Sequence, residues 1–202
     1  MVKRLHVLPV LLLLAGAGAC GGDSDTASEP APTTSTPAAL EAITAQGIAG
    51  VVRDAVGADL IESYSPAGES DSVGVLVQLA GRQVLVVNVQ IAGDVQIDSC
   101  EDLAETAVGS AGCVVDEDGT ITASGTAEPF SDDNKRGSTV LAQSVNPESG
   151  RVVYALFETY TRQAALDPAT LSAIVSDPAL AAMTDPATNE AGADIELLAQ
   201  PN

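Results

Sequence analysis

Two closely spaced runs of β-branched residues constrain the fold of this chain more than any other feature of its sequence. Residues 73–80 and 84–91 are rich in valine, and only Gly81-Arg82-Gln83 separates them. Two such runs around a short, glycine-containing connection predict a β-hairpin. Asn88 and Gln90 interrupt one face of the second run. The pattern therefore predicts an antiparallel sheet with one well-covered face and one partly covered face.

Further segments extend this sheet in the predicted fold. Asp118-Gly119 is a hairpin turn signal, and residues 146–150 have the composition of a turn. Residues 130–137 are expected to form a polar loop. The additional candidate strands are residues 60–64, 113–115, 120–127, 139–145 and 152–161. Together these segments predict an antiparallel β-meander of about five to six strands.

Helices are predicted before and within the strand region. Thr36-Pro37 offers a hydroxyl N-cap and a proline at the first helical position, followed by apolar residues at helical spacing. A helix is therefore expected over residues 37–56, with Gly57 as its C-terminal stop. Ser99 is the candidate N-cap of a second helix over residues 100–108.

The C-terminal region contains three aspartate–proline pairs, Asp167-Pro168, Asp177-Pro178 and Asp185-Pro186. Aspartate before proline is again an N-cap followed by a first helical residue. Helices are expected over residues 168–175 and 178–183, whereas the third pair leads into a polar tail. With one N-terminal helix and short C-terminal helices packed on the sheet, the predicted fold class is α+β.

The first 20 residues have the layout of a secretory signal. Lys3 and Arg4 are basic, residues 5–14 are almost wholly apolar, and small residues lead from there to Cys20. The apolar run is well short of the ~20 residues that a membrane-spanning helix needs. The segment therefore predicts export rather than a permanent membrane helix.

Ala17-Gly18-Ala19-Cys20 resembles the lipobox of bacterial lipoproteins, which ends in an obligatory cysteine. The resemblance implies a diacylglyceryl group on the Cys20 sulfur and cleavage just before this residue. Ala17 stands where the family most often has leucine, and cleavage without lipidation is the alternative. A lipoprotein of this kind would be anchored through its acyl chains at the extracytoplasmic face of the cytoplasmic membrane. The abundance of Ala, Gly, Val and Asp fits a high-GC bacterium.

Residues 21–37 are rich in Ser, Thr, Pro, Gly and Asp and contain no large apolar side chain. Such a segment cannot bury enough surface to fold, so a disordered tether is expected. The predicted organisation is a signal peptide at 1–19, the lipidated cysteine and tether at 20–37, and a single domain at 38–202.

The chain has three cysteines. If Cys20 carries the lipid, Cys100 and Cys113 remain as an even pair in an oxidising compartment. They are therefore predicted to form a disulfide, which would stabilise the domain by about 3 kcal/mol in the chain-entropy account.

Charge and histidine content exclude several functions. With 28 acidic and 8 basic residues the net charge is −20, which would repel nucleic acid and anionic lipid headgroups. His6 is the one histidine and leaves with the signal, which excludes Ser-His-Asp catalysis, Cys-His catalysis and histidine-ligated zinc in the mature chain. The sequence contains no Gly-x-Ser-x-Gly elbow and no phosphate-binding glycine loop, and no cofactor is predicted.

Two acidic patterns could carry chemistry. Asp116-x-Asp118-Gly119 resembles the middle of a calcium loop, but Val114 and Gly125 occupy the positions of the first and last ligands, which favours a hairpin turn. A second cluster could supply paired carboxylates for glycosidase-type catalysis or a weak calcium contact, although a solvated helix N-terminus is favoured. Its members are Asp94, Asp98, Glu101, Asp102 and Glu105.

A charged loop holds the one lysine of the mature chain, in Asp132-Asp133-Asn134-Lys135-Arg136. Lys135 could form a dyad with Ser131 or Ser138, but no Ser-x-x-Lys spacing supports this pairing. An exposed loop is favoured, and it is the first place to expect a protein contact.

These observations predict a non-enzymatic binding or accessory role in the cell envelope, with the membrane as one partner and an envelope protein or an apolar ligand as another. Neither catalytic nor metal-ligating residues are predicted. The alternatives are a cell-wall hydrolase that uses paired carboxylates and a carrier of an apolar ligand. Two carboxylates about 5–10 Å apart in a pocket would favour the hydrolase. An apolar cleft would favour binding, and an internal cavity the carrier.

Overall fold

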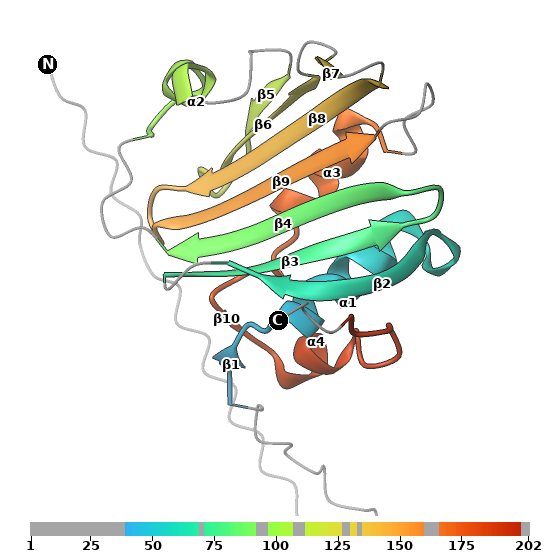
Figure 1. Ribbon diagram of the computed structural model, residues 1–202. Helices are drawn as coiled ribbons and strands as arrows, with labels where there is room; N and C mark the ends of the chain where they lie inside the picture. Colours follow the sequence, from blue (N-terminus) through green and yellow to red (C-terminus); the bar gives the residue numbers. More distant parts are fainter. Residues whose placement is uncertain are drawn as a thin grey trace, which may run out of the picture. The chain divides into compact units, whose positions relative to one another are not determined.

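A long antiparallel sheet organises the domain in the computed structural model (Figure 1). The structure describes residues 39–68, 71–91, 97–106, 112–126, 130–132, 135–159 and 166–198. All of them belong to one compact unit, residues 37–202. The signal segment, Cys20 and the expected tether lie outside the described residues.

The sheet has the strand order β2-β3-β4-β9-β8-β6-β5, and β7 pairs with the start of β8. A separate two-stranded sheet is formed by β1 (Glu41–Ala42) and β10 (Met183–Thr184). The strands of the main sheet are β2 (Ile61–Ala67), β3 (Ser72–Leu79), β4 (Gln83–Ile91), β5 (Cys113–Val115), β6 (Ile121–Thr126), β7 (Phe130–Asp132), β8 (Lys135–Asn146) and β9 (Arg151–Thr159).

The antiparallel α+β character is as predicted, and the β3–β4 hairpin is confirmed. The predicted number of strands and the single meander are wrong. In the described part of the chain, seven strands lie in a row because the seven-residue β2 and the three-residue β5 both pair and form the two edges. The chain also forms two meanders rather than one, joined where β4 pairs with β9 and Val87 lies opposite Ala155. This long-range pairing leaves no local trace in the sequence.

Two helices cover one face of the sheet and lie behind it in Figure 1. Helix α1 (Ala45–Val56) contacts β2 and β3, and α3 (Pro168–Ser176) contacts β6, β8 and β9. Alternate residues of each strand point to this face. The main core lies between these layers. Its fully buried members include Ile48, Val52, Val75, Val77, Leu79, Leu85, Val87, Phe157, Leu171 and Ile174.

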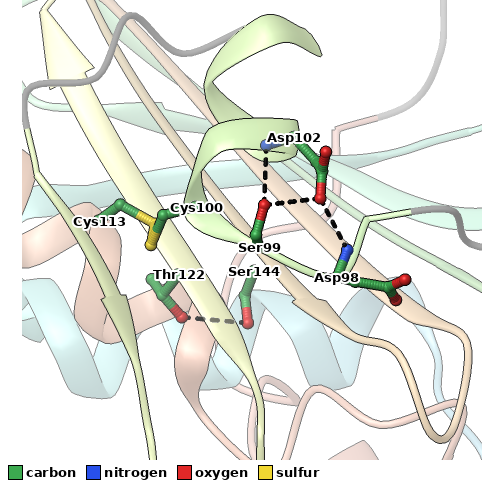
Figure 2. The surroundings of a disulfide bond; sticks show 7 residues. All are labelled: Asp98, Ser99, Cys100, Asp102, Cys113, Thr122 and Ser144. Atoms are coloured by element: carbon green, nitrogen blue, oxygen red, sulfur yellow. Dashed lines mark hydrogen bonds between the residues drawn. A yellow bond between two sulfur atoms is a disulfide. The ribbon is translucent and has the colours of Figure 1, made fainter.

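A smaller cluster lies on the opposite face at the β5 edge. Helix α2 (Cys100–Thr106) places the fully buried Leu103 over β6 and β8. Its buried partners are Ile121, Ala123 and Val145. The disulfide between Cys100 and Cys113 joins this helix to strand β5, with 5.8 Å between the two Cα atoms (Figure 2). The predicted disulfide is therefore confirmed.

The start of the first helix differs from the prediction. Strand β1 occupies residues expected to be helical, and α1 begins only at Ala45. The cap is Thr44, whose hydroxyl accepts from the Gly47 N–H at 3.1 Å. Pairing of β1 with β10 holds residues 41–42 in an extended conformation, which the local capping signal could not indicate. The predicted stop at Gly57 is confirmed by its positive φ of 97°.

The prediction was also wrong in three later segments. Residues 130–132, expected in a loop, form β7, which pairs with β8. No helix forms over 178–183, because the chain makes a turn that buries Leu180 and then enters β10. The third aspartate–proline pair instead begins α4 (Pro186–Glu190), and Asp185 accepts from the Ala187 N–H. A short 3₁₀ turn, η1 (Ala58–Leu60), follows α1.

None of the helices in the described ranges is both long and apolar enough to span a bilayer.

Candidate binding groove

A groove of about 550 Å³ lies between α3 and the β5–β6 hairpin. Its floor is the helix-side face of the hairpin, where Val114, Thr122 and Ser124 project. One wall is formed by α3, and solvent reaches the groove from the open side. The remaining lining residues are Gly112, Asp116, Thr120, Pro168, Ala169, Ser172, Ala173 and Ser176.

Helix α3 is positioned by its cap and by its apolar stripe. The Asp167 carboxylate accepts hydrogen bonds from the backbone N–H and the hydroxyl of Thr170, both at 2.8 Å. These bonds hold the pKa of Asp167 below its ordinary value. Leu171 and Ile174 are fully buried against the sheet. The helix therefore turns its small residues toward the groove, including Ala173.

The lining side chains are small, and this keeps the groove open. Val114, 66% exposed, is the largest apolar side chain of the floor. The other floor residues carry hydroxyls, and the Thr122 hydroxyl donates to Ser144 at 3.3 Å (Figure 2). The surface thus combines hydrogen-bonding groups with short apolar ones.

An acidic turn closes one end of the groove. The carboxylates of Asp116 and Asp118 both accept from the Thr120 N–H, at 2.8 and 3.0 Å. A hydrogen bond between the two carboxyl groups raises the pKa of Asp116 and lowers that of Asp118. Because both side chains are exposed, the turn presents negative charge to solvent beside the groove.

A smaller hollow of about 190 Å³ continues from this turn to Arg151. It shares Asp116, Thr120 and Ser176 with the groove. Burial lowers the pKa of Arg151, whose Nη1 donates to the Asp177 carbonyl oxygen at 3.4 Å. Its Nε is buried and has no hydrogen-bond partner among the described residues. The acidic turn therefore has a partly buried cation on its inner side.

Strand β5 forms the outer rim of the groove and one edge of the sheet. The Ser124 N–H donates to the Gly112 carbonyl at 2.9 Å, and the Asp116 N–H donates to the Thr120 carbonyl at 3.0 Å. In an antiparallel pair, backbone groups alternate between facing the partner strand and facing away from it. The N–H and C=O groups of Cys113 and Val115 therefore point away from β6. Among the described residues, β5 pairs with β6 alone.

Asp116 and Asp118, which resembled the middle of a calcium loop in the sequence, lie in an exposed turn and both accept from the Thr120 N–H. The pair forms the hairpin turn that the sequence favoured. Among the described residues, no group of three or more His, Cys, Asp or Glu side chains could hold a metal ion.

The second acidic cluster is brought together only in part. The Ser99 hydroxyl donates to the Asp102 carboxylate at 2.6 Å, and the Asp102 N–H donates back to Ser99 at 3.2 Å (Figure 2). This reciprocal pair caps α2 and lowers the pKa of Asp102. Asp94 lies outside the described residues. The cluster thus serves the helix N-terminus, as the favoured interpretation predicted.

The charged segment around Lys135 is a hairpin between β7 and β8, with Asp132 opposite Lys135 in register. Asp133 and Asn134 lie outside the described residues. The loop predicted to make a protein contact is therefore partly strand.

The groove between α3 and the β5–β6 hairpin was not among the sites predicted from the sequence. Its hydroxyl and small residues carry no sequence signal, because a long-range contact between α3 and β6 creates it.

No family model, no curated protein and no solved structure matches the chain.

Proposed function

We propose that this protein is a bacterial envelope lipoprotein, anchored by an acylated Cys20, that binds a partner non-enzymatically through the groove between α3 and the β5–β6 hairpin. The lipobox-like Ala17-Gly18-Ala19-Cys20 supports the anchor. A tether over residues 21–37 would let the domain reach partners near the extracytoplasmic face of the cytoplasmic membrane.

The groove is the observation that carries the binding role. Its volume of about 550 Å³ falls in the range of ligand sites in proteins. In the acidic cluster that could supply paired carboxylates for a hydrolase, Asp102 instead exchanges hydrogen bonds with Ser99 at the cap of α2. The groove is open along one side rather than enclosed, which favours a segment of a partner over a fully sequestered apolar cargo.

Acylation is tested by Cys20→Ala. This variant should lose metabolic labelling with a fatty acid and should move from the membrane fraction to the soluble fraction. Ser24→Ala, in the expected tether, is the matched control and should keep both properties. Unchanged labelling and fractionation of Cys20→Ala would contradict the lipoprotein assignment.

The groove is tested by a photoreactive amino acid placed at Ala173, which lines it. Ala187 on α4 is the matched control, because both alanines are exposed helical positions and only Ala173 borders the groove. Irradiation of intact cells should give a discrete adduct at Ala173 and none at Ala187. Absence of an adduct at Ala173, or equal labelling at both positions, would overturn the binding role.

The mass of the adduct also separates the alternatives. A polypeptide adduct supports partner binding, whereas an adduct with a small apolar molecule would replace it with the carrier function. Release of soluble cell-wall fragments by the purified domain, abolished by Glu101→Gln in the second acidic cluster, would replace it with the hydrolase function.

A further inference from the structure

We infer that the groove takes an extended peptide segment bearing a basic residue, which adds to β5 as a further strand of the sheet. This inference rests on the proposed function and names the chemistry of the partner. Three features of the β5 edge point to it: its outward backbone groups, the groove along its helix side and the acidic turn at its end.

The backbone of β5 offers a short hydrogen-bonding ladder. The N–H and C=O groups of Cys113 and Val115 face away from β6, as the bonds of Gly112 and Asp116 to β6 require. An extended peptide can pair with these groups without displacing any bond of the described fold. Strand addition at a sheet edge is a recurrent mode of peptide recognition.

The same sheet already uses this arrangement at its other edge. The Tyr64 N–H of β2 donates to the Glu196 carbonyl at 2.9 Å, and the Leu198 N–H donates to the Tyr64 carbonyl at 2.8 Å. The C-terminal segment thus lies along β2 through a parallel bridge between Tyr64 and Leu197. An extended segment therefore closes one edge, and β5 offers the equivalent backbone groups at the other.

The groove supplies contacts for side chains of the added strand. Val114 points to the helix side of β5, between the two residues whose backbone groups face outward. Every second side chain of a strand paired with β5 would point to the same side. Those side chains could reach over Val114 toward Ala173, and the small lining residues leave room for them.

Charge selects a basic partner rather than a second copy of the chain. Asp116, Glu117 and Asp118 are exposed in the turn that follows β5. A lysine or arginine at the matching end of the bound strand would face this turn. A second copy would instead bring another chain with a net charge of −20 to an acidic edge.

The disulfide prepares this edge for binding. Cys113 carries one of the two outward-facing sets of backbone groups and is linked to α2 through Cys100. A three-residue strand would otherwise lose conformational entropy when a partner orders it. Fixing the strand in advance removes part of that cost.

The experiment uses the purified mature chain and fluorescent peptides of alternating Val and Thr with a Lys at each end. A peptide with Glu in place of both Lys tests charge, and a peptide N-methylated at alternate positions tests backbone pairing. Fluorescence anisotropy gives the dissociation constants. The Lys peptide should bind about fivefold more tightly than the Glu peptide, and N-methylation should abolish binding.

Two variants of the edge residue isolate strand addition. Val115→Pro removes the outward N–H and leaves the bonds between β5 and β6 in place, because Pro is tolerated where an edge N–H faces outward. Val115→Thr keeps the N–H. Val115→Pro should weaken binding of the Lys peptide about tenfold, the equivalent of one hydrogen bond, while Val115→Thr binds as the parent does. Equal binding by both variants would overturn the inference.

A second pair of variants tests the contribution of the acidic turn to binding. Asp118→Asn should weaken the Lys peptide several-fold and leave the Glu peptide unweakened, whereas Asp59→Asn, an exposed aspartate in η1, should change neither. Circular dichroism confirms that each variant is folded. If neither peptide binds, or if Asp59→Asn acts like Asp118→Asn, the inference is wrong.

Crosslinking separates this inference from the proposed function. A polypeptide adduct at Ala173 that persists in Val115→Pro would show that the groove binds a partner without strand addition, so the proposed function would stand and the inference would fall. Loss of that adduct in Val115→Pro but not in Val115→Thr supports both.

Discussion

The two edges of the main sheet are treated in opposite ways. At the β2 edge the chain's own C-terminal segment bonds to Tyr64, which is only 5% exposed. At the β5 edge Val115 is 52% exposed, and no described residue pairs with the outer side of the strand. Among the described residues, one edge is closed by the chain's own C-terminal segment, and the other has no pairing partner on its outer side.

The difference shows how an exposed edge can be kept without inviting aggregation. Natural proteins protect edges by making them short and by placing charges beside them. Strand β5 has three residues and leads into the acidic turn at Asp116. The short length and the adjacent negative charge also limit which strands can pair with β5, because a long, flat or acidic strand would match it poorly. The features that protect the edge from aggregation therefore also select its partner.

The largest expected effect comes from removing the disulfide at the open edge. Replacing both Cys100 and Cys113 by serine should lower the free energy of unfolding by about 3 kcal/mol, because the loop they close regains its freedom in the unfolded chain. Denaturant unfolding measures the change.

Hydrogen exchange on the same variant places the effect within the sheet. The amides of β5 and α2 should exchange faster, because the free energy of local opening falls there. The Tyr64 amide at the closed edge should still exchange only through the same fraction of the free energy of global unfolding as in the parent protein. A loss well under 1 kcal/mol, or equal local opening at the two edges, would contradict the comparison.

A pair of proline variants should give an intermediate effect with opposite results at the two edges. Leu198→Pro removes the N–H that donates to Tyr64, and should cost about 0.5–1.5 kcal/mol of stability. Val115→Pro removes no bond of the described fold and should be close to neutral. Thermal and denaturant melts of the two proteins measure the difference. Equal destabilisation would show that the β5 edge is already paired.

The smallest effect is expected in acid at the cap of α2. The Ser99 hydroxyl donates to Asp102 and lowers the pKa of that carboxyl, so folding favours its ionised form. The stabilisation is therefore complete above the ordinary aspartate pKa and is lost as the pH falls through the lower, folded-state value. Carboxyl NMR titration should show a lowered pKa for Asp102 that returns to the ordinary range in Ser99→Ala. An unchanged titration in that variant would contradict the cap assignment.

Local patterns predicted the parts of this fold that local interactions determine. The β3–β4 hairpin follows from its valine runs, and the cap at Asp167 follows from an aspartate–proline pair. The disulfide followed from counting cysteines. The start of α1 was misplaced because two threonines, Thr36 and Thr44, both offer hydroxyl caps. Pairing of β1 with β10, more than a hundred residues apart in sequence, decides between them.

The candidate site could not be predicted in the same way. Ser124 and Ala173 are ordinary surface-type residues in the sequence, and only the packing of α3 against β6 makes them the two sides of a groove. The open edge likewise depends on which strand ends the sheet. The strand order depends on the pairing of β4 with β9, and this pairing cannot be recognised from the sequence of either strand alone. The acidic turn at Asp118 was visible in the sequence, but its place beside a groove was not.

Amide hydrogen exchange of the free, unlabelled domain tests the contrast between the two edges most directly. The Tyr64 amide, bonded to Glu196, should be strongly protected, and the Val115 amide should exchange at nearly the rate of an unstructured peptide. Saturation with the Lys peptide should then protect Val115 and leave Tyr64 unchanged. Protection of Val115 equal to that of Tyr64 before any peptide is added would contradict an open β5 edge.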